Sequence, residues 1–66
     1  MQIMINGAPQ QVPEGADLSA ALAVYGVAER GVAVAVDGDV VPRADWPGTA
    51  VRPGAVVEVL TAVQGG

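Results

Sequence analysis

The sequence contains no cysteine, no histidine and no phenylalanine. The absence of cysteine and histidine excludes disulfides, thiol catalysis and the usual zinc sites, so the fold must be stabilised by apolar packing. A chain of 66 residues is near the size at which a single domain can still bury enough surface, and its hydrophobic content of 52% suits that requirement. Without phenylalanine, the core must consist mainly of small aliphatic side chains.

Positive charge is also scarce, because three arginines face seven acidic residues and give a net charge of −4. Such a chain repels phosphate backbones and anionic lipid surfaces, so neither nucleic acid nor a membrane is an expected partner. No apolar run approaches the roughly 20 residues of a membrane helix, and the start lacks the pattern of a signal peptide. We therefore expect a cytoplasmic protein that is a monomer on its own.

The first residues predict a β-hairpin. Alternating β-formers lead into Asn6-Gly7, a pair that favours a type I′ turn because both residues tolerate positive φ. We expect strands at about residues 2–6 and 9–13. Two prolines in the second of these cannot donate hydrogen bonds, which is typical of an edge strand.

A short helix is predicted next. Asp17 is placed to cap it, and Gly26 is placed to end it in the left-handed conformation. Between them an apolar stripe has helical spacing. Its members are Leu18, Ala21, Leu22 and Tyr25.

The second half of the chain predicts three further strands, at residues 32–36, 40–41 and 56–62. Residues 32–36 alternate valine with alanine, which places the larger side chains on one face. Pro42 should end the short strand at 40–41. Two Pro-Gly pairs then predict an irregular crossing, in which we expect Trp46 to be a core anchor whose indole N–H needs a partner. One helix over a sheet predicts an α+β, two-layer domain.

Residue parity divides the last strand into two faces, with Val57, Val59 and Thr61 on one of them. If the second face of the sheet is open to solvent, its apolar residues form a candidate docking surface for a partner protein. The candidate docking face consists of Val56, Glu58, Leu60 and Ala62. The alternative is that these are ordinary scattered surface residues.

We predict that residues 1–63 form the domain. The last three residues, Gln64-Gly65-Gly66, are expected to form a flexible tail. Glycine has no side chain, so a diglycine end can enter a slot too narrow for other residues. The candidate reactive group is the Gly66 carboxylate; Gly65 gives clearance, and Val63 and Gln64 lead into the slot. Frayed, functionless terminal residues are the alternative.

Several motifs together resemble a known family. They are the opening Met1-Gln2-Ile3 with Asn6-Gly7, the stretch Ala35-Val36-Asp37-Gly38, the run Val40-Val41-Pro42-Arg43 with Trp46 three residues later, and Gly65-Gly66. In combination the chain resembles the ThiS family, the sulfur carriers of thiamine biosynthesis. The resemblance implies a ubiquitin-like β-grasp fold: a mixed sheet of four to five strands with one helix packed on one face.

The resemblance also implies a mechanism in which an E1-like adenylyltransferase uses ATP and Mg²⁺ to adenylate Gly66. A persulfide protein then supplies sulfur, and the resulting thiocarboxylate donates it to thiazole synthase. The chain itself binds no cofactor or metal and has no catalytic residue. Alternatives are the small subunit of molybdopterin synthase, a ubiquitin-like protein modifier and a non-covalent interaction domain. Asp37 and Asp39 are interpreted as turn residues, because two carboxylates lack the further oxygen ligands that calcium needs.

Overall fold

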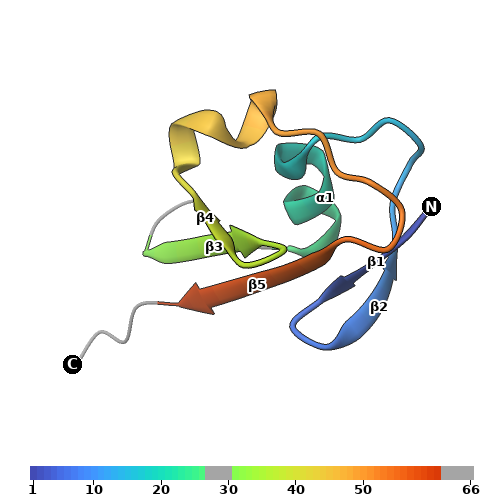
Figure 1. The fold of residues 1–66 in the computed structure, drawn as a ribbon, viewed down its shortest axis with the longest axis horizontal. Helices are drawn as coiled ribbons and strands as arrows, with labels where there is room; N and C mark the ends of the chain where they lie inside the picture. Colours follow the sequence, from blue (N-terminus) through green and yellow to red (C-terminus); the bar gives the residue numbers. More distant parts are fainter. Residues whose placement is uncertain (27–30, 62–66) are drawn as a thin grey trace.

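The computed structural model describes residues 1–26 and 31–61. Within these ranges five strands form one sheet, and one α-helix and one 3-10 helix cover one of its faces (Figure 1). The elements are β1 (Gln2–Ile5), β2 (Ala8–Gln11), α1 (Leu18–Tyr25), β3 (Val32–Val36), β4 (Asp39–Val41), η1 (Arg43–Gly48) and β5 (Val56–Thr61).

The strands lie in the order β2-β1-β5-β3-β4. β1 runs parallel to β5, and the other neighbouring pairs are antiparallel. The sheet is therefore mixed, and the last strand lies at its centre between the first and third strands (Figure 1). This confirms the predicted two-layer α+β architecture, and β2 is the edge strand that its proline content indicated.

The first hairpin turns at the predicted pair, since Asn6 and Gly7 have φ angles of 52° and 80°. The predicted strand bounds were wrong by one or two residues. Both turn residues are needed for the reversal, so Ile5 pairs directly with Ala8 and β1 ends before Asn6. β2 stops at Gln11, although the Val12 amide still donates to the Met1 carbonyl at 2.9 Å.

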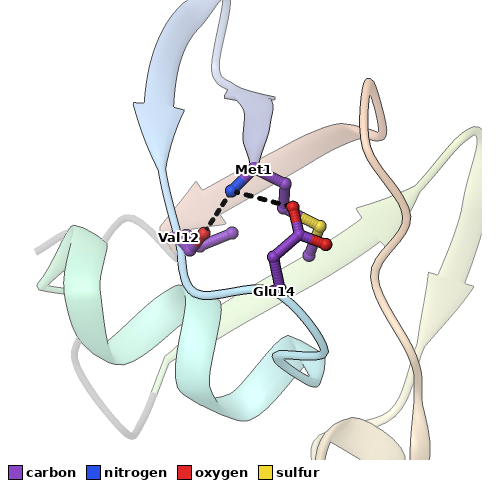
Figure 2. A network of polar contacts seen from close by, with 3 residues as sticks. All are labelled: Met1, Val12 and Glu14. Atoms are coloured by element: carbon purple, nitrogen blue, oxygen red, sulfur yellow. Dashed lines mark hydrogen bonds and ion pairs between the residues drawn. The ribbon is translucent and has the colours of Figure 1, made fainter.

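The chain start is attached to this hairpin by polar contacts (Figure 2). The Met1 ammonium donates a hydrogen bond to the Val12 carbonyl at 2.7 Å and lies 3.7 Å from a carboxylate oxygen of Glu14. The Val12 side chain is buried in the core. Val12 therefore joins the first strand to the core although it lies outside β2.

The helix begins and ends as the sequence predicted. The Ala20 amide donates to the Asp17 carboxylate at 2.8 Å, and Gly26, with φ 92°, donates its amide to the Leu22 carbonyl at 2.9 Å. Of the predicted apolar stripe, Leu18, Ala21 and Leu22 are buried. Tyr25, the last residue of α1, is 37% exposed.

The crossing between β4 and β5 is more regular than predicted. Pro42 ends β4 as expected, but residues 43–48 then form a 3-10 helix, a missed element. Its short-range bonds include that from the Asp45 amide to the Pro42 carbonyl at 2.8 Å, and Pro47 needs no amide partner. Trp46 is the predicted anchor: it is 7% exposed, and its indole Nε1 donates to the Val41 carbonyl at 3.0 Å.

The core lies between the sheet and the two helices, and no charged side chain enters it among the described residues. Its members come from nearly every element. They are Ile3, Ile5, Val12, Ala16, Leu18, Ala21, Leu22, Val34, Trp46, Val51, Ala55, Val57 and Val59. Within residues 1–26 and 31–61, the helices cover only this face and leave the second face of the sheet open.

Candidate functional site

The two faces of β5 differ as residue parity predicted. Val57 is fully buried and Val59 is 8% exposed, whereas Val56 is 49% and Leu60 is 70% exposed. Glu58 is also exposed, on the same face as Val56 and Leu60. The other predicted members of this site, Ala62, Val63, Gln64, Gly65 and Gly66, lie outside the described residues.

Strand register places further residues beside this face. Ala33 of β3 lies directly opposite Leu60, and Ala35 lies opposite both Glu58 of β5 and Val40 of β4. Val40, Ala35 and Glu58 thus form a row across three neighbouring strands. Because direct cross-strand neighbours share a face of the sheet, these residues extend the exposed surface away from β5.

We define the open-face patch as Ala33, Ala35, Val40, Val56, Glu58 and Leu60. It contains a shallow hollow of about 90 Å³, bounded by side chains from β3, β4 and β5. The alanines form the low floor of this hollow. Val40, which is 74% exposed, and Leu60 stand higher beside it.

The alanines and Val40 were not predicted as part of the site. The alternation in residues 32–36 was a signal, since it placed the alanines on the face away from the helix. Which strand they would lie beside depends on the sheet order, and the sequence does not reveal that order directly. The patch is apolar with a single carboxylate, Glu58, so a complementary surface needs an apolar projection with a nearby positive charge.

A second hollow, of about 600 Å³, lies on the helical side of the domain, between α1 and η1. Ser19, Leu22, Ala23, Arg43, Ala44, Trp46 and Pro47 line it. Among the described residues, no group of three or more acidic side chains could hold a metal ion. Asp37 and Asp39 flank the turn between β3 and β4, where Asp37 has a φ of 51°.

A model of the ThiS family matches residues 3–66. The chain belongs to the ThiS family. The crystal structure of thiamine biosynthesis protein ThiS from Geobacter metallireducens is similar, with 32% identity, full coverage of both chains and a TM-score of 0.82. A solution NMR structure of a thiamine biosynthesis protein from the same organism has 32% identity and a TM-score of 0.79, with coverage of 100% of this chain and 88% of the other. No curated protein matches the sequence.

Membership of the ThiS family confirms the β-grasp fold that the sequence motifs indicated. It also supports a role as a sulfur carrier. The matched region begins in β1 and extends past β5 through the diglycine end. In the part of the chain that the structure describes, no helix is both long and apolar enough to cross a membrane.

Proposed function

We propose that this ThiS-family chain carries sulfur for thiazole formation in thiamine biosynthesis, with the Gly66 carboxylate as its reactive group. The observation that carries the proposal is the family match, which spans residues 3–66 and so includes Gly65-Gly66. The thiamine biosynthesis protein that covers the whole chain at 32% identity supports the same pathway. The chain acts as a co-substrate, and its partner enzymes supply the catalytic groups.

The first step must convert an unreactive carboxylate into an acyl group with a good leaving group. On an E1-like adenylyltransferase, a Gly66 carboxylate oxygen attacks the α-phosphorus of MgATP. The new O–P bond forms as the bond to the β-phosphate breaks, and pyrophosphate leaves. Mg²⁺ and cationic groups of that enzyme stabilise the phosphate charge.

The second step replaces AMP with sulfur. The terminal sulfur of a persulfide on a donor protein attacks the Gly66 carbonyl carbon, and AMP leaves with the electrons of the C–O bond. A second thiol then attacks the donor's sulfur in the resulting acyl disulfide. That thiol and the donor end as a disulfide, and Gly66 is left with a thiocarboxylate. Thiazole synthase receives this sulfur during ring formation.

The open-face patch is the proposed docking surface for these partners. It is the exposed side of β5, and β5 is the strand that continues into residues 62–66. A partner that holds Leu60 therefore binds the chain six residues before Gly66. Gln64 and Val63 would lie in the entrance of the partner's active site, and Gly65 in its narrowest part.

The primary test is an intact-mass measurement. We would incubate the purified protein with an E1-like adenylyltransferase, MgATP and sulfide, which displaces AMP directly. The expected result is a gain equal to the sulfur-minus-oxygen mass difference, localised to Gly66, and no gain in a variant that lacks Gly66. The absence of any gain, with a partner that is active on another carrier, would refute the proposal.

A second test separates docking from chemistry. Leu60→Ser removes the 70% exposed Leu60 side chain from β5, and Val24→Ser is the matched control because Val24 is 52% exposed on α1, on the other side of the domain. We expect the KM of adenylation to rise about tenfold for Leu60→Ser, as for loss of an interface anchor of roughly 1.4 kcal/mol. The control should retain the original KM. Equal effects of the two substitutions would exclude the open-face patch as the docking surface.

A further inference from the structure

Asn6 makes contacts that its place in a turn does not require. Its side-chain Oδ1 accepts a hydrogen bond from the Val59 amide at 2.7 Å, and its Nδ2 donates to the Val59 carbonyl at 3.1 Å. One side chain thus satisfies both backbone groups of a residue 53 positions away. Nδ2 also lies 3.5 Å from the hydroxyl of Tyr25 at the end of α1.

These contacts continue the pairing of β1 with β5 past the end of β1. The Met4 amide donates to the Ala55 carbonyl and the Asn6 amide to the Val57 carbonyl, both at 2.9 Å. The next carbonyl along β5 on that side is that of Val59. The chain has already turned away at Asn6-Gly7, so no backbone amide of β1 is available there, and the Asn6 side chain takes its place.

The last part of β5 depends on this substitute partner. Beyond Val57, β3 pairs with one edge of β5, but β1 does not reach the other. Val59 is 8% exposed, so its amide and carbonyl would pay a desolvation penalty if Asn6 were removed. Fraying of residues 59–61 would relieve this penalty, because water could then solvate both groups.

We propose that Asn6 is a positioning residue for the reaction at Gly66. By holding the backbone of Val59, it keeps the docking residue Leu60 and the strand end at Thr61 fixed to the sheet. This inference rests on the proposed function. A partner that holds Leu60 then finds Gly66 within a fixed reach, since five residues after Thr61 span at most about 17 Å. Fraying from Val59 takes Leu60 out of its fixed position opposite Ala33, so the partner must order residues 59–61 again before it can bind them.

The second hairpin supplies a matched control. Asp37 precedes Gly38 as Asn6 precedes Gly7, and Asp37 also has a left-handed φ, 51° against 52° for Asn6. Its carboxylate accepts from the Val56 amide at 3.0 Å, so it too binds the backbone of β5, but at the start of the strand. There the bond from the Asp37 amide to the Val56 carbonyl, at 2.8 Å, would survive loss of the side chain.

The two test variants are therefore Asn6→Gly and Asp37→Gly. Glycine retains the positive φ in both turns, so each substitution removes a side-chain contact without straining the backbone. Amide hydrogen exchange identifies the contact that is lost. We expect at least tenfold faster exchange at Val59 in Asn6→Gly and at Val56 in Asp37→Gly, with both proteins folded at the assay temperature by circular dichroism.

The decisive measurement is the steady-state release of pyrophosphate by the E1-like adenylyltransferase with each full-length variant. We expect Asn6→Gly to raise the KM for the carrier three- to tenfold with kcat within twofold, because a less ordered free state weakens binding while the bound complex reacts normally. Asp37→Gly should change neither constant by more than twofold.

Equal KM values for the two variants would overturn the inference, and so would an unchanged KM in Asn6→Gly despite faster exchange at Val59. In either case Asn6 would be a structural residue alone. If the unaltered protein is not adenylated by an active partner, the proposed function fails and this inference fails with it. If the unaltered protein is adenylated normally and either of these KM results is obtained, the inference fails alone and the proposed function stands.

Discussion

Trp46 offers the sharpest test of how the domain is held together. Its ring is 7% exposed, between α1 and the sheet, and its indole N–H donates to the Val41 carbonyl at 3.0 Å. Trp46→Phe keeps an aromatic ring but removes this donor and part of the buried area. The lost hydrogen bond costs about 1 kcal/mol and the smaller ring adds a cavity, so we expect a total loss of about 1–3 kcal/mol.

Trp46→Ala should lose about 3–5 kcal/mol, the usual range for truncating a buried aromatic ring. A domain of this size has a stability of roughly 3–10 kcal/mol at about 0.05–0.15 kcal/mol per residue. The alanine variant should therefore lose at least about a third of this stability, and it should be largely unfolded at 25 °C if the domain lies at the lower end of the range. The phenylalanine variant should remain folded, with a midpoint temperature lower by roughly 4–8 °C per kcal/mol.

Urea unfolding followed by circular dichroism gives these free energies, because it does not depend on the fluorophore that the substitutions remove. Thr49→Val is the control in the same segment. It removes a hydrogen bond from the Thr49 hydroxyl to the Asp45 carbonyl, 2.7 Å long but exposed, and should cost less than about 1 kcal/mol. If Trp46→Phe is as stable as the unaltered protein within about 0.5 kcal/mol, Trp46 is not the anchor described here.

Substitutions at three further positions test the local contacts, each by its effect on the urea midpoint. Asp17→Ala removes the helix cap at Ala20 and should cost about 1 kcal/mol, whereas Asp17→Asn should cost little. Gly26→Ala should also cost about 1 kcal/mol. The added methyl group meets no atom within 4 Å, so the cost arises only from the left-handed φ of 92°. A neutral result would show that this backbone conformation is not unfavourable for alanine. Glu14→Gln should change the free energy of unfolding by less than about 0.5 kcal/mol. The Glu14 side chain is 84% exposed, so solvent screens its ion pair with the Met1 ammonium. A larger loss would show that the ion pair in Figure 2 is stronger than its exposure suggests.

Local signals in the sequence were sufficient for the turns and caps. Asn6-Gly7, Asp17 and Gly26 each act on the backbone within a few residues, so residue type alone predicts their conformation. Trp46 and Pro42 were also placed correctly, because a buried indole needs an acceptor and proline cannot extend a strand ladder. The 3-10 helix after Pro42 was missed because the Pro47-Gly48 pair, a turn signal, lies within it.

Features that depend on strand register could not be predicted in the same way. The Asn6 side chain binds a residue 53 positions away, and the sequence suggested only a turn for it. The alanines of β3 belong to the open-face patch because Ala33 lies opposite Leu60, a pairing set by the order of the sheet. Residue parity predicted the exposed face of β5, but the residues that lie beside this face on neighbouring strands follow from long-range packing.

The central place of β5 also governs when the molecule can fold during synthesis. Without β5, the described strands make two separate hairpins, β1 with β2 and β3 with β4, and isolated hairpins are marginally stable in water. Synthesis completes both hairpins first and then, at about 5–20 residues per second, needs roughly 1–4 s to add the twenty residues that follow Val41, up to Thr61. The nascent chain must therefore keep its apolar strands from aggregating until its final strand emerges, and a product terminated before Val56 lacks the strand that joins the sheet.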